Sequence, residues 1–326
     1  MEKAPDRKIR GFFFVVAPQG PASGWPPAGR AGVRAPTRAR GGEGVELPRP
    51  RRAALALRRA DDRRRGALPV RAAPGDRAGA REAGAIARRY FDAGDSIRAM
   101  EKGTHDLVTQ ADLEIDRFLV ERLRQAFPDD GILTEESGGD GADSLWVIDP
   151  IDGTTNFARR IPHFAISIAF HAKGRTESGV VYNPVRDEMF AARRGFGATC
   201  NGQPIRVRPT RGATDAVVDA GYSLKRPVAD YVALVGRLLD SDFAFVQNGS
   251  AAIGLAHVAC GRIDGYCELF LHSWDVLAGL LLVEEAGGWV SDFAAGGGIL
   301  SGNAVLAGTP AIRAALERIL PLGTAI

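Results

Sequence analysis

Two aspartates that follow an apolar stretch are the residues of this sequence best suited to catalysis or ligand binding. In Trp146–Asn156 (WVIDPIDGTTN), an apolar segment leads to Asp149, and Asp152 follows three residues later. Pro150 is expected to end the strand, because proline donates no backbone hydrogen bond to a sheet. Both carboxylates can then converge on one point beside the strand end. Carboxylate oxygens are hard ligands that suit Mg²⁺, which often shares its coordination shell with a substrate phosphate.

The residues directly after Asp152 are suited to hold a phosphate. Gly153 lets the backbone approach a ligand closely. Thr154 and Thr155 are expected to begin a short helix, whose free N–H groups can donate to a phosphate. Taken alone, the same pattern also fits a strand, an Asp-Gly turn and a helix N-cap at Asp152.

Three further acidic segments stand at similar places in the chain. Glu135 follows an apolar segment in LTEES, Asp275 precedes an apolar helix in HSWD, and Asp112 lies in VTQAD. Each could be a solvated turn or an acid that complements a helix dipole. Together, however, four acidic elements at strand ends and helix starts would repel one another unless cations lay between them. Two metal ions about 4 Å apart that share carboxylates are a known device for phosphate hydrolysis.

With these segments in view, the sequence resembles the inositol monophosphatase family, within the superfamily of lithium-sensitive, magnesium-dependent phosphatases. The resemblance runs from about residue 80 to the C-terminus. The segments that carry it follow the order of the family: DLVTQAD (106–112), LTEES (133–137), WVIDPIDGTTNF (146–157), GVVYNP (179–184), GATCNG (197–202), NGSAA (248–252) and WDVLAGLLLVEEAGG (274–288). The pair DPIDGTTN and WDVLAG is highly specific. The resemblance implies hydrolysis of a small phosphate monoester, with myo-inositol monophosphate as the leading substrate.

The resemblance also implies a role for each acidic residue. Asp149 would bridge two Mg²⁺ ions, and Glu135 and the backbone carbonyl of Ile151 would join it at the first ion. Asp152 and Asp275 would hold the second ion. The third, weaker Mg²⁺ of the family would lie near Glu135.

The expected catalytic residues are Asp112, Thr154 and Glu135. By resemblance, Asp112 and the Thr154 hydroxyl would orient a metal-activated water for in-line attack on phosphorus, with Glu135 beside this water. The amides of Gly153 and Thr154 would bind phosphate oxygens. No protein nucleophile is needed, so no phosphoenzyme is expected.

The resemblance suggests four further substrate contacts. Glu268 matches the acid that family members use to hydrogen-bond a sugar or cyclitol hydroxyl. Ser250 and Ala251 match the strand-to-helix turn that touches the substrate ring. Lys102 stands where relatives carry a loop lysine near the active site. The residues around Glu268 (YCELF) vary from the family pattern, which leaves the ring preference open.

The expected fold is the layered αβαβα sugar-phosphatase fold, with an α+β portion at about 78–208 and an α/β portion at about 209–326. Hydrophobic spacing predicts helices at Ala80–Ala93, Ala111–Phe127 and Trp274–Ala286 and a strand at Leu145–Ile148. We expect the catalytic cleft to lie between the two portions.

Residues 1–77 differ in composition from the rest of the chain. Residues 1–80 contain 18 Lys and Arg against 7 Asp and Glu, whereas residues 81–326 contain 24 against 32. Segments rich in Arg, Pro and Gly cannot bury enough apolar surface to offset the entropy lost on ordering. We therefore predict a disordered extension, or a start codon assigned too early. A transit peptide and an anion-binding arm are the alternatives.

Composition also limits the location and the partners. No run of about 18 apolar residues exists, so no membrane partner is expected. Three cysteines without metal-type spacing suit a reducing cytoplasm. The arginines of the extension occur without aromatic interleaving, so binding to nucleic acid is not expected. The resemblance implies a homodimer.

Two alternatives to the leading function remain open. The same chemistry could act on histidinol phosphate, fructose 1,6-bisphosphate or a nucleotide 3′-phosphate. A non-catalytic binding or regulatory protein could retain the same fold, although the intact acidic motifs argue against this reading.

Overall fold

The computed structural model describes residues 74–93, 99–103, 106–139 and 141–320. The chain divides into two compact units, Met1–Arg65 and Gly66–Ile326, and every described residue lies in the second. Most of the predicted extension, residues 1–73, lies outside the described residues. The side chain of Lys102 also lies outside the described part of the structure.

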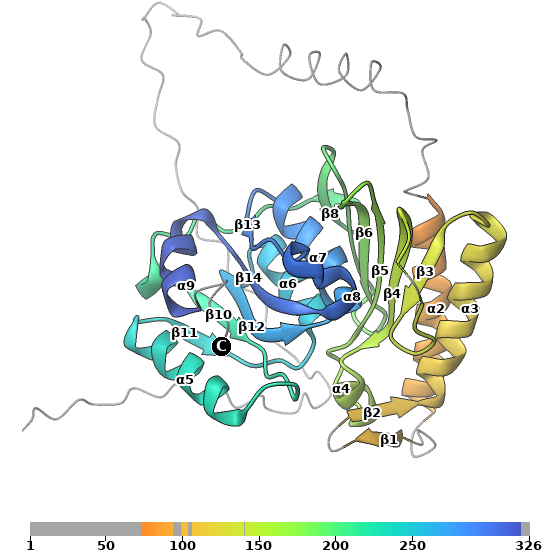
Figure 1. The fold of residues 1–326 in the computed structure, drawn as a ribbon, viewed down its shortest axis with the longest axis horizontal. Helices are drawn as coiled ribbons and strands as arrows, with labels where there is room; N and C mark the ends of the chain where they lie inside the picture. Colours follow the sequence, from red (N-terminus) through yellow and green to blue (C-terminus); the bar gives the residue numbers. More distant parts are fainter. Residues whose placement is uncertain (1–73, 94–98, 104–105, 140, 321–326) are drawn as a thin grey trace, which may run out of the picture. The chain divides into compact units, whose positions relative to one another are not determined.

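Two large β-sheets form the framework of the second unit (Figure 1). The first has seven strands in the spatial order β3 (Gly131–Thr134), β4 (Ser144–Asp152), β5 (Ala165–Ala172), β6 (Arg175–Asn183), β7 (Glu188–Arg193), β8 (Gly197–Cys200) and β9 (Gln203–Pro204). The second has five in the order β11 (Ala244–Val246), β10 (Val217–Ala220), β12 (Gly265–Leu271), β14 (Asn303–Gly308) and β13 (Trp289–Val290). A separate hairpin pairs β1 (Ala99–Gly103) with β2 (Asp106–Thr109).

Helices cover these sheets in three layers (Figure 1). The outer face of the seven-stranded sheet packs against α2 (Pro74–Asp92) and α3 (Gln110–Ala126), and its inner face packs against α6 (Ala251–Ala259) and α7 (Ser273–Glu285). The far side of the five-stranded sheet carries α5 (Val228–Asp240) and α9 (Arg313–Ile319). Two shorter helices are α4 (Thr154–Ala158) and α8 (Gly298–Ser301). This arrangement confirms the predicted αβαβα layers.

The helix pair α6 and α7 forms the apolar middle layer. Its residues are buried on almost every side, as in Ala252, Leu255, Val276 and Leu282, which are all fully buried. A helix that is apolar all round must pack against protein on both faces, and here the two sheets supply those faces. None of the helices in the described part of the chain is both long and apolar enough to span a bilayer.

The structure corrects the predicted end of the strand that contains Asp149. Pro150 does not stop β4, which continues to Asp152. The pairing with β5 instead shifts by one residue, because Asp149 lies opposite Ser167 and Asp152 opposite Ala165. A bulge of this kind absorbs the missing N–H group of proline and turns the strand. The predicted helix at Ala80–Ala93 likewise begins earlier, at Pro74.

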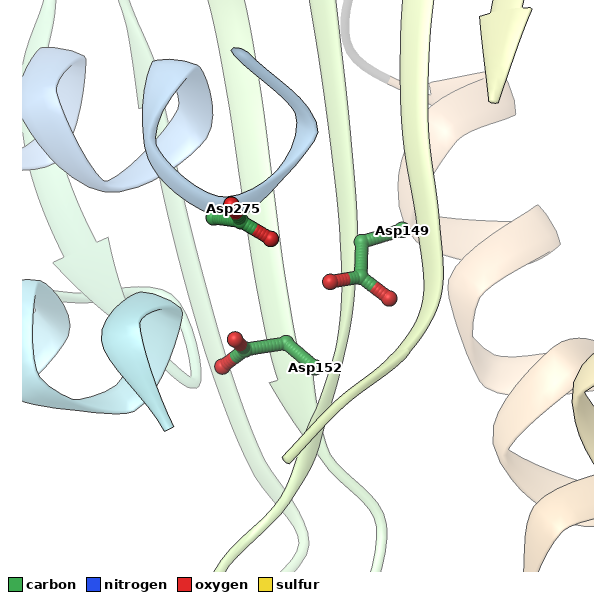
Figure 2. A group of neighbouring side chains, drawn as sticks. All are labelled: Asp149, Asp152 and Asp275. Carbon is green, nitrogen blue, oxygen red and sulfur yellow. The ribbon is translucent and has the colours of Figure 1, made fainter. Parts of the chain in front are cut away.

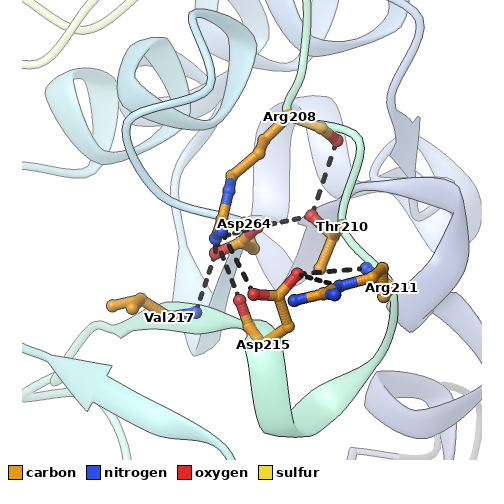
Figure 3. Close-up of polar contacts among 6 residues, drawn as sticks. All are labelled: Arg208, Thr210, Arg211, Asp215, Val217 and Asp264. Atoms are coloured by element: carbon orange, nitrogen blue, oxygen red, sulfur yellow. Dashed lines mark hydrogen bonds and ion pairs between the residues drawn. The ribbon is translucent and has the colours of Figure 1, made fainter.

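A partly buried ionic network joins the segment after β9 to the five-stranded sheet (Figure 3). Asp264, which is 1% exposed, accepts hydrogen bonds from the Thr210 hydroxyl and, at 2.8 Å, from the Val217 backbone N–H. Arg208 lies 3.4 Å from Asp264 and 3.1 Å from Asp215. These bonds anchor the start of β10 and stabilise the connection between the two sheets.

The close approach of β6 to α7 yields a prediction about stability. A Cβ atom on Gly179 would lie 2.7 Å from the Cα atom of Ala278, so Gly179→Val should lower the free energy of unfolding by about 1–3 kcal/mol. The matched control is Gly236→Ala within α5, where a Cβ atom would meet nothing within 4 Å. That change should stabilise by about 0.4–1 kcal/mol. Denaturant unfolding tests both, and an unaltered midpoint for Gly179→Val would contradict the close packing.

Candidate metal centre

Three aspartates from two distant segments meet beside the middle helix layer (Figure 2). Asp149 and Asp152 come from β4, and Asp275 lies in the first turn of α7. One carboxylate oxygen of each lies within 4.8 Å of the others. Asp149 and Asp152 are buried, whereas Asp275 is half-buried. The structure thus brings together three of the four carboxylates that the sequence assigned to metal ions.

Backbone amides orient two of these carboxylates. The Ile151 N–H donates to Asp149 Oδ1 at 2.9 Å, which the bulge in β4 makes possible. The His272 N–H donates to Asp275 Oδ2 at 2.7 Å, so Asp275 reaches back over the start of α7. In each case the named bond engages one oxygen of the carboxylate.

Asp152 is held by the start of α6. Its carboxylate accepts hydrogen bonds from the Ser250 hydroxyl, from the Ala251 N–H at 3.2 Å and from the Ala252 N–H at 2.9 Å. The N-terminus of a helix favours a negative charge, and these donors match that preference. The sequence predicted Ser250 and Ala251 as substrate contacts, but in the structure both bind Asp152.

The electrostatics of the cluster are unfavourable when all of its acids are ionised. Burial, followed by the charge of Glu135, raises the pKa of Asp149 well above its ordinary value. The same two causes raise the pKa of Asp275. Burial also raises the pKa of Asp152 to about 6, although its hydrogen bonds oppose the shift. Acids in this state need either protons or a cation, and a divalent ion with a preference for oxygen ligands fits the donor set.

Glu135 directly follows β3, and its N–H donates to the Ile148 carbonyl at 3.2 Å. Its charge contributes to the raised pKa of both Asp149 and Asp275, which places it in the electrostatic field of the cluster. The three-aspartate group itself does not include Glu135.

The residues predicted to orient water, Asp112 and Thr154, contact each other. The Thr154 hydroxyl lies 3.4 Å from Asp112 Oδ1 and 3.1 Å from the Ile151 carbonyl oxygen. Burial raises the pKa of Asp112 to about 6. Gly153 precedes α4 with φ of 94°, a left-handed conformation that favours glycine. The structure therefore joins Asp112, Ile151 and Thr154 by hydrogen bonds, with Gly153 next to them in the chain.

Glu268 lies on β12 and is buried. It is 6% exposed, and its Oε2 atom accepts the Tyr266 hydroxyl at 2.5 Å. Burial raises the pKa of Glu268 to about 8, and the charges of Asp152 and Asp219 add to this effect. This shift favours the protonated form of Glu268, which can donate a hydrogen bond.

Two polar residues that the sequence analysis passed over help to build the site. Thr109 caps α3, and both its hydroxyl and its N–H donate to Asp112 Oδ2. The Asn156 amide donates at 2.8 Å both to the His163 carbonyl and to the Asn248 carbonyl, so it ties α4 to the turn before α6. The spacing of Thr109 and Asp112 is that of a capping box, which could have been read from the sequence. The contact of Asn156 with Asn248 spans 92 residues and left no local signal.

The raised pKa of Glu268 predicts a specific dependence of stability on pH. Between pH 4.5 and about 8 the native state keeps a proton that the unfolded chain has released, so the free energy of unfolding should fall as pH rises. Glu268→Gln removes this titration, and the variant should therefore gain stability relative to the wild type across that window. Chemical unfolding at several pH values measures the difference. The control Glu121→Gln alters an exposed acid on α3, and a pH-independent difference for Glu268→Gln would contradict the assignment.

The chain is similar in sequence to proteins of a known family. The chain matches the inositol monophosphatase family over residues 72–322. Nus factor SuhB of Escherichia coli (strain K12) is 44% identical over 239 residues, which are 72% of this chain and 89% of that protein. Nus factor SuhB of Pseudomonas aeruginosa is 41% identical over 252 residues, which are 74% of this chain and 93% of that protein.

Solved structures show the same fold. The extragenic suppressor protein suhB from Bartonella henselae has a TM-score of 0.70 and 36% identity, and the match covers 76% of this chain and 97% of that one. The IMPase of Thermotoga maritima has a TM-score of 0.68 and 32% identity, with coverage of 76% and 95%. The chain belongs to the inositol monophosphatase family.

Proposed function

We propose that this protein is a magnesium-dependent phosphatase that hydrolyses a small phosphate monoester, with myo-inositol monophosphate as its leading substrate. The observation that carries the proposal is the convergence of carboxylate oxygens from Asp149, Asp152 and Asp275 within 4.8 Å. Membership of the inositol monophosphatase family supports the reaction class. A neighbouring structure is that of an inositol monophosphate-bound Staphylococcus aureus IMPase-II, which is 25% identical.

The metal ligands in this proposal are Asp149, Asp152, Asp275, Glu135 and the carbonyl of Ile151. When bound, two or three Mg²⁺ ions would neutralise phosphate charge and lower the pKa of water. The raised pKa values of Asp149 and Asp275 support this proposal, because a cation would relieve the repulsion that raises them.

The protein's own groups position the other reactants. Asp112 and the Thr154 hydroxyl orient the attacking water, and their 3.4 Å separation supports this pairing. The amides of Gly153 and Thr154 hold phosphate oxygens. In this account Asp112 must be ionised to accept a proton from water, so activity should depend on its deprotonation.

The alcohol part of the substrate lies toward β12 in this proposal. Protonated Glu268 donates to a ring hydroxyl, Ser250 and Ala251 contact the ring while they hold Asp152, and Lys102 is a further predicted substrate contact. Histidinol phosphate, fructose 1,6-bisphosphate and a nucleotide 3′-phosphate are the alternative substrates. From the family we also expect the protein to be a cytoplasmic homodimer and to be inhibited by Li⁺.

A second candidate function comes from the relatives named Nus factor SuhB. The Escherichia coli protein of that name is 44% identical over 89% of its length. This chain could share the role for which that protein is named, either with or without catalysis. Replacement of the Escherichia coli gene by this one, in wild-type and Asp149→Asn forms, separates the two functions. If both forms replace the Escherichia coli protein equally well, this role depends on the folded protein and not on catalysis.

Loss of the bridging carboxylate should abolish the proposed reaction. Asp149→Asn keeps the size of the side chain but removes its charge from both metal positions, so turnover should fall by about three orders of magnitude. Phosphate release at fixed Mg²⁺ measures this on myo-inositol 1-phosphate, histidinol phosphate, fructose 1,6-bisphosphate and a nucleotide 3′-phosphate.

The matched control is Asp240→Asn, which makes the same change at an exposed position on α5. It should leave turnover unchanged. Near-normal activity of Asp149→Asn on the preferred substrate would refute the metal assignment, and absence of Mg²⁺-dependent turnover on every ester would refute the phosphatase proposal.

A further inference from the structure

The position of Glu135 depends on a short turn after β3. Glu135 and the residues that follow it, up to Gly139, leave the edge of the seven-stranded sheet. The turn closes on itself, because Thr134 and Gly138 exchange two backbone hydrogen bonds at 3.0 and 3.1 Å. The Ser137 N–H also donates to the Thr134 hydroxyl oxygen at 2.8 Å. The turn therefore has a defined shape.

Glycine fixes the exit from this turn. Gly138 has φ of 68°, and Gly139 has φ of 147°. A Cβ atom on Gly139 would lie 2.1 Å from the Ile132 carbonyl oxygen. Only glycine fits such a site, so the internal geometry of the turn is set by its own residues.

The outer side of the turn is not held by packing. Ser137, Gly138 and Gly139 are exposed and border a hollow of about 400 Å³ between the turn and α3. A turn without apolar cover can swing about its ends at low energetic cost. The bond from the Glu135 N–H to the Ile148 carbonyl holds one end of the turn, and a bond from a rigid element would fix its outer end.

Asp116 provides such a bond. It lies on α3, is 4% exposed, and accepts a hydrogen bond from the Ser137 hydroxyl through Oδ2. Its Oδ1 atom has no hydrogen-bond partner among the described residues. Burial of a carboxylate with an unsatisfied oxygen lowers stability, so stability alone does not explain an acid at this position.

Asp116 also lies one helical turn after Asp112, on the same face of α3. Asp112 contacts Thr154 at the start of α4, and Asp116 contacts Ser137 in the turn that carries Glu135. One rigid helix thus reaches two of the loops that surround the aspartate cluster.

We propose that Asp116 is a positioning residue, which holds Ser137 and thereby fixes the Glu135 carboxylate beside Asp149 and Asp275 for metal binding. This inference rests on the proposed metal-dependent function. It concerns the affinity for the metal ion, because Asp116 is not a member of the three-aspartate group and bonds to Ser137 in the turn that carries Glu135.

Direct binding of Mn²⁺, followed by electron paramagnetic resonance, tests the proposal without reliance on activity. Ser137→Ala and Asp116→Ala should each weaken Mn²⁺ binding by about 10–100-fold, as is usual when a group that orients a ligand is lost. Asp116→Asn still offers an oxygen to the Ser137 hydroxyl and should stay within about threefold of the wild type. The double alanine variant should bind no more weakly than the weaker single variant, because both changes remove one interaction.

Controls separate this role from a general loss of structure. Glu121→Ala removes an exposed acid of the same helix that borders the same hollow, and it should bind Mn²⁺ as the wild type does. Ser137→Ala removes a donor from the buried Asp116 and should lower the unfolding temperature by only about 2–4 °C, so Mn²⁺ binding is measured well below that temperature, where the variant is folded. At saturating Mg²⁺, both single alanine variants should keep the wild-type KM for the phosphate ester.

Unchanged Mn²⁺ affinity in Ser137→Ala, or losses in the double variant that multiply, would overturn the role of Asp116. Wild-type protein that binds no Mn²⁺ would instead overturn the proposed metal function, on which this inference rests. The wild-type titration therefore distinguishes failure of the inference from failure of the function.

Discussion

The mutual repulsion of three buried or half-buried aspartates is the constraint on which this structure depends. Asp149, Asp152 and Asp275 offer oxygens within 4.8 Å of one another. Burial raises the pKa values of all three, and the charges of neighbouring acids add to this effect for Asp149 and Asp275. A fold that merely needed stability would not gather them, because charges of one sign lower stability when they are desolvated together. A shared divalent cation removes the repulsion, and it also provides a place for a phosphate.

The apolar layers supply the free energy that holds these acids in place. Asp275 lies at the start of α7. The close contact of Gly179 with Ala278 determines how near that helix packs to the sheet. Asp152 is fixed from the other side by the start of α6. The positions of the carboxylates therefore follow from helix packing against the seven-stranded sheet, while backbone amides orient individual oxygens. The same elements, α6, α7 and the seven-stranded sheet, therefore form the apolar core and position the carboxylates.

Much of the fold and of the aspartate cluster could be predicted from the sequence, since acids at strand ends and helix starts are local features. Contacts that depend on a distant segment could not be predicted. The bulge that carries β4 through Pro150 depends on pairing with β5, and a lone proline reads locally as a strand end. The bonds from Ser250 and Ala251 to Asp152 cross about a hundred residues, so their predicted contact with a ring missed this second role. The predicted role of Lys102 stays a prediction, because its side chain lies outside the described residues.

The most direct test of the central claim is anomalous diffraction from crystals grown with Mn²⁺, which substitutes for Mg²⁺ at oxygen sites. We expect anomalous peaks between the carboxylates of Asp149, Asp152 and Asp275, with at least one ion in contact with Asp149. Crystals of Asp149→Asn grown in the same way should lose or weaken these peaks. Ordered wild-type crystals with the three carboxylates in place but no anomalous density among them would contradict the claim that a metal ion resolves their repulsion.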